Sequence, residues 1–249
     1  ALGPEPWQAV YAQPCRRPTD GRYGENPNRL QHYFQLQVIL KPSPDEIQDL
    51  YIESLASIGV HRNKNDIKFI DDNWESPSLG AAGVGWEVWL NGMEISQFTY
   101  FQQIGGLDCN PVTGELTYGL ERIAMHLQEV DNLYDVKWNN EISYGEIYLQ
   151  NEEENSKYNF EFVEPKILIK FFEDMEVECI KLLENGLPIP AYDILLQNSH
   201  TLNLLDSKQA ISSTERQAYI VILRKLSFLI AKKYLEIREK INFPLMKNS

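Results

Sequence analysis

Hydrophobic and polar positions divide the chain into two parts. Over residues 1–150, strand-like hydrophobic runs alternate with turns rich in glycine, proline and asparagine, and after residue 150 the periodicity becomes helical. We therefore predict an α+β fold. An antiparallel β-sheet flanked by helices is expected over residues 1–150, followed by an all-helical C-terminal region over residues 151–249.

The first part predicts several strands and two helices. Strands are expected at 29–41, at 68–71, in a hairpin over 85–103 and at 115–118. Helices are expected at 44–58 and 119–129. The helical spacing of the first helix predicts one buried face, made by Ile47, Leu50, Tyr51 and Leu55.

The second part predicts three helices. Residues 163–184 and 191–205 have a helical period, with Pro188 and Pro190 expected between them. Ser212 and Glu215 then have the spacing of a capping box. They predict the start of a long amphipathic helix that ends near residues 242–244.

The Asn91-Gly92 pair predicts the turn of the hairpin. A two-residue loop there places one set of side chains on the core face, namely Trp86, Val88, Leu90, Met93 and Ile95. It places the other set on the opposite face, namely Glu87, Trp89, Glu94 and Ser96. Two carboxylates and an indole on one face suit an ammonium group or Mg²⁺, and a solvated sheet face has the same pattern.

A loop between two strand-like runs concentrates arginine. Residues 16–29 (RRPTDGRYGENPNR) contain four arginines, two glycines and two prolines. Guanidinium groups bind phosphate oxygens through paired hydrogen bonds, so this loop suits a phosphate-bearing ligand. A solvated polar loop with surface arginines explains the same composition.

The segment 114–122 (GELTYGLER) leads from a strand into a helix. Strand alternation places Glu115 and Thr117 on one face and Leu116 and Tyr118 on the other.

Arg122 follows in the first turn of the helix. A cation there is unfavourable for the helix dipole, so a functional Arg122 needs an anionic or aromatic partner. The competing interpretation is a surface arginine paired with Glu121 or Asp131.

Composition and charge limit the partners. The chain is 43% hydrophobic and 24% charged, with a net charge of -13, as expected for an acidic globular protein. It has no visible signal peptide or membrane-spanning run, and its three cysteines have no disulfide or zinc spacing. We therefore expect a cytoplasmic protein that binds nucleic acid weakly on its own.

Three long stretches resemble the α subunit of the bacterial heterotetrameric glycyl-tRNA synthetase. They contain the motifs PCRRPTDGRYGENPNR, WEVWLNGMEISQFTYFQQIGG and VTGELTYGLERIAM, and the resemblance covers essentially the whole chain. It implies a class II aminoacyl-tRNA synthetase fold. It also implies a glycine–tRNA ligase subunit that forms glycyl-adenylate from glycine and ATP, with Mg²⁺, and transfers glycine to the tRNA 3′ end.

The resemblance assigns the ATP site. Class II motif 2 corresponds to residues 11–41 and motif 3 to residues 119–122. Arg17 or Arg16 takes the position that contacts the ATP α-phosphate and the amino-acid carboxylate, and Arg122 takes the motif 3 position. Tyr33 takes the position that stacks on adenine. The implied ATP-binding residues are Arg17, Glu25, Asn28, Arg29, Tyr33, Gln35, Gly119, Glu121 and Arg122.

The glycine site is assigned in the same way. Residues 86–89 and 119–122 are also similar to the catalytic domain of alanyl-tRNA synthetases, which implies that Glu115 binds the substrate amine. The implied glycine-binding residues are Trp89, Glu94, Gln97, Glu115 and Thr117. Trp89 is expected to act as a steric wall against larger amino acids. Glu87 and Glu94 are the expected Mg²⁺ ligands.

The family also implies partners. These are an α homodimer within an α2β2 tetramer, a β subunit that carries most of the recognition of tRNA(Gly), and no membrane. Alternatives are a catalytically silent adenylate- or partner-binding paralogue and a similar ligase for another small amino acid such as alanine. The chain begins at Ala1 without an initiator Met, and the helix and strand of class II motif 1 are expected to be missing upstream.

Overall fold

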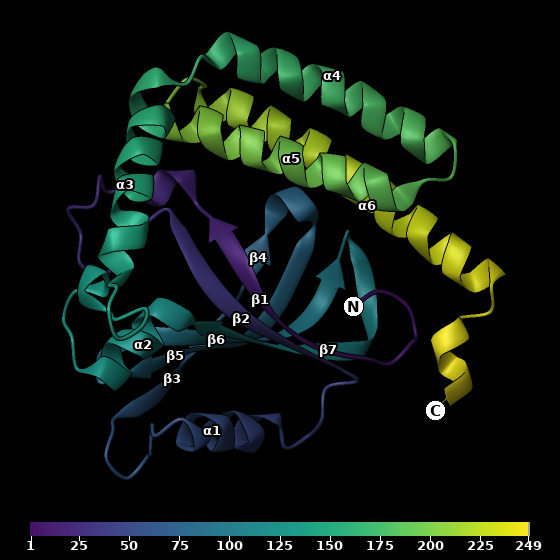
Figure 1. Ribbon diagram of the computed structural model, residues 1–249. Coiled ribbons are helices and arrows are strands. Elements are labelled where there is room, and N and C mark those ends of the chain that lie inside the picture. Colours follow the sequence, from purple (N-terminus) through teal and green to yellow (C-terminus); the bar gives the residue numbers. More distant parts are fainter. Residues whose placement is uncertain (249) are drawn as a thin grey trace.

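A computed structural model describes residues 1–248 (Figure 1). Its seven strands form one antiparallel sheet in the order β1-β2-β7-β6-β5-β3, with β4 paired to β5. The strands are β1 (Trp7–Arg16), β2 (His32–Lys41), β3 (Ile67–Asp72), β4 (Glu75–Ser76), β5 (Ala81–Leu90), β6 (Met93–Ile104) and β7 (Leu107–Gly119). The predicted α+β fold with an antiparallel sheet and C-terminal helices is therefore confirmed.

Helices lie on both sides of the sheet (Figure 1). On one side is α1 (Ile47–Ser57), and on the other is a layer made by α4 (Pro165–Glu184), α5 (Pro188–Ser207) and α6 (Ser213–Lys240). At one end of the sheet lie α2 (Leu120–Gln128) and α3 (Tyr144–Lys157). Because α3 crosses residue 150, no loop marks the boundary there, and the division into two domains stays a prediction.

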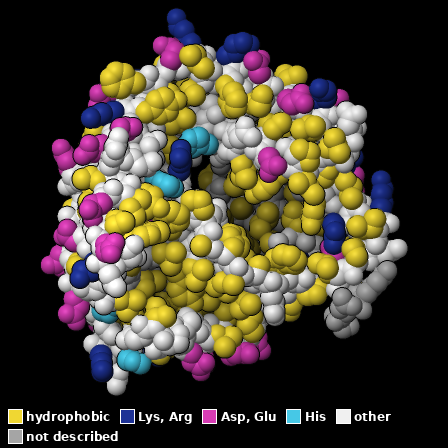
Figure 2. Space-filling model, in the orientation of Figure 1, with side chains coloured by type: hydrophobic (Ala, Val, Ile, Leu, Met, Phe, Trp, Pro, Cys, Tyr) yellow, Lys and Arg dark blue, Asp and Glu magenta, His cyan; other side chains and the backbone are white. Residues whose placement is uncertain are grey.

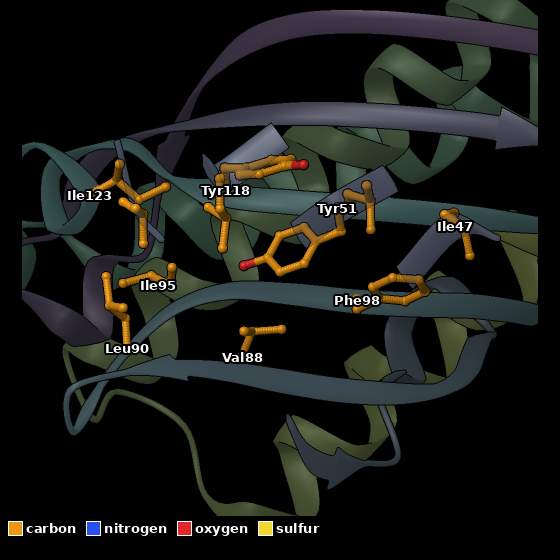
Figure 3. Close-up of a cluster of buried hydrophobic side chains, with 11 residues drawn as sticks. Ile47, Tyr51, Val88, Leu90, Ile95, Phe98, Tyr118 and Ile123 are labelled. Atoms are coloured by element: carbon orange, nitrogen blue, oxygen red, sulfur yellow. The ribbon is translucent and has the colours of Figure 1, made fainter. Parts of the chain in front are cut away.

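The main hydrophobic core lies between α1 and the sheet (Figure 3). Tyr51 and Leu55 of α1 are fully buried against Val88 of β5, Phe98 of β6 and Leu116 of β7. The predicted helix face is correct for Ile47, Tyr51 and Leu55 and wrong for Leu50, whose side chain is 43% exposed. The three buried residues are each four positions apart, so they form a stripe too narrow to include position 50.

Two strands are longer than their sequence pattern predicts. β7 begins at Leu107 and β5 at Ala81, while the hydrophobic alternation begins at 115 and 85. Glycines break the pattern in both extensions. At Gly85 a Cβ would collide with the carbonyl oxygen of Phe98 on the neighbouring strand, so the close approach of β5 and β6 requires glycine there.

The hairpin register is correct beside the turn and wrong beyond it. Trp89 lies opposite Glu94 as predicted, but a β-bulge follows, and Val88 lies opposite Ser96 instead of Ile95. The extra residue moves Ser96 to the core side, where it is 3% exposed, and brings Gln97 opposite Glu87 on the polar face. Ile95 nevertheless stays buried in the core.

Helix-start patterns explain the other helices. The Ser212/Glu215 capping box is present at the start of α6, as predicted. Pro188 and Pro190 occupy the first turn of α5 instead of the preceding loop, because the first helical residues need no hydrogen-bonded N–H. The helix α3 was not predicted, although Ser143 and Glu146 form the same capping box in front of it. None of the helices among residues 1–248 is long and apolar enough to cross a membrane.

The helical layer has its own core and is tied to the sheet. Phe172, Leu195 and Leu223 are buried between α4, α5 and α6. The Ser227 hydroxyl of α6 donates to the Leu79 carbonyl at 2.8 Å, and Arg238 of α6 pairs with the buried Glu5 before β1. Between this layer and the sheet the surface is hollowed, with mainly hydrophobic side chains in view on its walls (Figure 2).

Candidate active site

A cleft opens at the end of the sheet where β2, β6 and β7 meet α2. The loop between β1 and β2 forms one wall and the first turn of α2 forms the other. The lining residues are Arg17, Asp20, Asn28, Arg29, Leu30, Tyr33, Gln35, Glu94, Ile95, Ser96, Gln97, Thr117, Gly119, Glu121, Arg122, Met125 and Leu133. Most of the predicted ATP-binding residues thus lie together, although they come from segments about 100 residues apart.

The arginine loop is held by one buried carboxylate. Glu152 of α3 is 1% exposed and accepts hydrogen bonds from the backbone N–H groups of Arg22 and Gln31, both at 2.8 Å. The Arg17 N–H also donates to the Gln31 carbonyl at 2.8 Å. The loop between the strands is therefore closed at its base and anchored to α3.

Replacing Glu152 by alanine is expected to destabilise the fold by about 2–5 kcal/mol, because one buried and one partly buried backbone donor would lose their partner. The same change should raise the ATP KM, since the loop carries Arg17 and Arg29. Urea unfolding and ATP titration measure the two effects. Glu154→Ala, on the exposed face of the same helix, is the matched control. A Glu152 variant as stable as this control would contradict the anchoring role.

Arg17 and Tyr33 face each other at the cleft. The Arg17 guanidinium lies 5.5 Å from the centre of the Tyr33 ring, and burial raises the pKa of the Tyr33 hydroxyl to about 12. Tyr33 therefore stays neutral at physiological pH. Arg16, the alternative to Arg17, is the last residue of β1 and lies opposite His32 of β2 in the sheet. It is not among the residues that line the cleft.

Arg122 has a different partner from the two expected from sequence. Its Nη1 donates to the Glu94 carbonyl oxygen at 2.8 Å and lies 3.2 Å from the Glu94 carboxylate. Neither Glu121 nor Asp131 forms this pair. Both side chains are partly exposed at 30% and 36%, so the pair can separate at small cost when an anion arrives.

Glu121 lines the cleft but is already occupied. Its Oε1 accepts from the Phe34 N–H at 2.7 Å and from the Tyr144 hydroxyl at 2.9 Å. Burial raises the pKa of this carboxyl above its usual range, and the hydrogen bonds oppose that shift. Through these two hydrogen bonds, Glu121 links α2 to β2 and α3.

The floor of the cleft is a row of polar side chains, Gln35, Gln97 and Thr117, each hydrogen-bonded to a residue outside the cleft lining. Thr117 Oγ1 donates to Gln37 Oε1 at 2.8 Å, and Gln37 Nε2 donates to Gln35 Oε1 at 3.1 Å. On the other side of Thr117, Gln97 Nε2 donates to Asp72 Oδ2 at 2.7 Å. The sheet therefore presents polar groups in fixed orientations to a ligand.

Four further predicted residues lie outside the cleft lining: Glu25, Glu87, Trp89 and Glu115. Trp89 Nε1 donates to Glu87 Oε2 at 2.9 Å, so the indole N–H and one carboxylate oxygen already have a hydrogen-bond partner. Glu115 lies two residues before Thr117 on β7, on the same face of the sheet, and is opposite Thr99 of β6. Burial raises its pKa to about 7, which makes it a titratable group near the cleft at neutral pH.

The expected metal ligands differ in how well they fit. Glu94 lines the cleft beside Arg122, while Glu87 accepts the indole N–H of Trp89. Among residues 1–248, no group of three or more His, Cys, Asp or Glu side chains is arranged to hold a metal ion. A carboxylate combined with ligand phosphates is a common Mg²⁺ arrangement, and Glu94 is the predicted residue that suits it.

Sequence reasoning missed several residues of the site. Asp20 and Leu30 line the cleft, while Asp72, Gln37 and Glu152 hold its lining residues in place. The capping box at Ser143 was the available indication of α3 and hence of a helix beside the loop. Nothing in the local pattern around Asp72 distinguishes it from a surface carboxylate.

The fold and the cleft agree with the class of protein expected from the resemblance. An antiparallel sheet with one arginine on a strand–loop–strand and another on the helix after the last strand is the arrangement expected for a class II aminoacyl-tRNA synthetase. Within that class, the chain belongs to the glycyl-tRNA synthetase alpha subunit family, whose model matches residues 1–239.

Two solved structures of pyrrolysyl-tRNA synthetase from Desulfitobacterium hafniense are similar to parts of the chain. One has a TM-score of 0.40 and 13% identity over 58% of this chain. The other, described as PylSc, has a TM-score of 0.38 and 15% identity over 57% of this chain. The matches cover 50% and 49% of those proteins, so the chain spans about half the length of each.

Proposed function

We propose that the chain is the catalytic subunit of a glycine–tRNA ligase. It activates glycine with ATP to glycyl-adenylate and, together with a β subunit, transfers glycine to the tRNA 3′ end. The observation that carries the proposal is the convergence of Arg17 and Arg122 on one cleft with the polar row of Gln35, Gln97 and Thr117.

The reaction suits a site rich in arginine. The glycine carboxylate attacks the ATP α-phosphorus, the bond to the bridging oxygen breaks, and pyrophosphate leaves. A carboxylate is already ionised at pH 7, so no general base is required. Catalysis then depends on positioning the two reactants and on stabilising negative charge along the phosphates.

The positions of the charged groups support the ATP assignment that the resemblance implies. Arg17 binds the α-phosphate and the glycine carboxylate, and Arg122 leaves Glu94 to bind the triphosphate. The start of α2 at Gly119 adds backbone N–H groups that favour an anion. Glu25, Asn28 and Arg29 of the loop contribute further contacts.

Adenine and Mg²⁺ complete the nucleotide site. Adenine stacks on Tyr33 once Arg17 turns from the ring towards the phosphates. Glu94 would hold Mg²⁺ with the phosphate oxygens, where the ion would neutralise phosphate charge. The Arg122–Glu94 pair thus keeps both groups at the cleft before ATP binds.

The glycine assignment places the ammonium over the polar row. Gln97, Thr117 and Glu115 face that side, and the carboxylate of glycine points towards Arg17. The hydrogen bond from its indole N–H to Glu87 orients Trp89. In this proposal the Trp89 ring is the wall that limits the space beyond the α-carbon. Because glycine is the smallest amino acid, a rigid wall excludes larger ones more strongly than added contacts would.

The acidic charge of the chain supports the proposal that another subunit binds most of the tRNA. At a net charge of -13 the chain is a poor match for a polyanion, so a β subunit is expected to supply most of the tRNA contacts within an α2β2 assembly. Salt-dependent binding assays test this. Tight binding of tRNA(Gly) by the isolated chain at physiological salt would contradict it.

ATP–pyrophosphate exchange tests the proposed activity and its substrate. Glycine should support exchange, and alanine and serine should support it at least about 100-fold less well, because both would collide with the wall. Preferred exchange with alanine would identify a ligase for that amino acid instead. No exchange with any small amino acid, with or without β, would identify a silent paralogue.

A further inference from the structure

One hydrogen bond joins two strands that are not neighbours. Asp72 is the last residue of β3, and Gln97 is in the middle of β6, with β5 between them in the sheet. Their side chains meet at 2.7 Å across the polar face, next to Gly85, which has no side chain to block the path. Asp72 is not among the residues that line the cleft, while Gln97 is.

The chemistry of this bond decides which way the Gln97 amide points. A carboxylate can only accept hydrogen bonds, so the atom of Gln97 that meets Asp72 must be the amide nitrogen. The amide oxygen, Oε1, is then the atom left for a ligand. Without Asp72 the amide would be free to rotate and present its N–H groups instead.

The neighbouring side chain has a matching orientation. Thr117 lies directly opposite Gln97 on β7, and its hydroxyl hydrogen is used by Gln37, which leaves the oxygen as an acceptor. Gln37 is 7% exposed and, like Asp72, is not part of the cleft lining. Two adjacent acceptors, each fixed by a residue behind it, suit a primary ammonium group.

We propose that Asp72 is a positioning residue that orients Gln97 Oε1 as an acceptor for the ammonium group of the amino-acid substrate. The inference rests on the proposed function and adds a residue to it. Asp72 acts through Gln97: by fixing the Gln97 amide, it favours a substrate whose ammonium group donates to Gln97 Oε1.

The first test separates positioning from a structural role. Asp72→Ala should raise the glycine KM about tenfold or more, while kcat and the ATP KM stay within about twofold. The matched control is Asp108→Ala, because Asp108 accepts from Gln103 at 3.0 Å at the far end of β6. It removes the same type of bond and should leave the glycine KM unchanged. Equal glycine KM values for wild type and Asp72→Ala would overturn the inference.

The second test exchanges the two partners. Gln97→Glu alone places two carboxylates side by side and should weaken glycine use about tenfold or more. Adding Asp72→Asn supplies a donor at position 72 and leaves a carboxylate oxygen facing the ammonium. The double variant should therefore return the glycine KM to within about threefold of wild type.

The outcomes distinguish this inference from the proposed function. A double variant no better than Gln97→Glu alone would overturn the role of Asp72 and leave glycine activation intact. Absence of glycine-dependent exchange in the wild-type chain assembled with β would overturn the proposed function and the Asp72 inference with it. Circular dichroism of each variant checks that it has folded.

Discussion

Replacing Arg122 by alanine is expected to lower glycine-dependent ATP–pyrophosphate exchange by more than about 100-fold, the usual effect of removing one charged group that stabilises a transition state. The residue lies at the start of α2, where a cation is unfavourable unless an anion is close. In the structure the anion is Glu94, and in the proposed reaction it is the triphosphate. Activity within tenfold of wild type would count against this role.

Two further variants show whether the loss reflects catalysis. Arg122→Lys keeps the charge but lacks the planar guanidinium, so it should recover only part of the activity. Arg62→Ala removes an exposed arginine between α1 and β3 and should behave like wild type. The thermal stability of Arg122→Ala should change little, because a partly exposed ion pair contributes about 1 kcal/mol or less.

Replacing Glu115 by glutamine is expected to raise the glycine KM about 10- to 100-fold and leave the ATP KM nearly unchanged, because a charged hydrogen bond to the substrate amine is lost. The pKa of Glu115 near 7 adds a pH dependence. In the wild type the glycine KM should fall as pH rises from 6 to 8, since the ionised carboxylate binds ammonium. The variant should show a flat profile. Unchanged glycine kinetics would remove Glu115 from the site.

Glu115→Gln should also change the stability of the fold: it weakens glycine binding but should stabilise the protein at alkaline pH. Burial raises the pKa of Glu115 from 4.5 to about 7, so folding favours its protonated form. The contribution to stability is full below pH 4.5 and is lost as pH rises through 7. Glu115→Gln should therefore be more stable than wild type at pH 8 by about 1–3 kcal/mol, and similar to it at pH 4. Denaturant unfolding at the two pH values measures the difference.

Local patterns predicted much of the fold. The Asn91-Gly92 turn and the Ser212/Glu215 capping box are specified by neighbouring residues, and both are present where expected. The β-bulge beside Val88 was not predictable from alternation, because it depends on how β5 and β6 fit between their neighbours in the sheet. That single bulge exchanged the places of Ser96 and Gln97.

The candidate site also has a part that the sequence predicts and a part that only the structure shows. The arginine loop and the GLER segment were recognisable in sequence, and Arg17, Arg29 and Arg122 from these two segments line one cleft. The residues that hold them were not recognisable, because Glu152 and Asp72 reach partners on distant segments. Such residues have the local pattern of ordinary surface carboxylates, and only the fold shows that one is buried and the other is bonded.

In the proposed reaction this cleft joins glycine to the α-phosphate of ATP. A single-turnover reaction of the chain, assembled with β, with glycine and ATP labelled at the α-phosphorus measures that step. We expect glycine-dependent labelled glycyl-adenylate approaching one equivalent per α subunit, together with unlabelled pyrophosphate. Formation of ADP with no labelled adenylate at saturating glycine would contradict it.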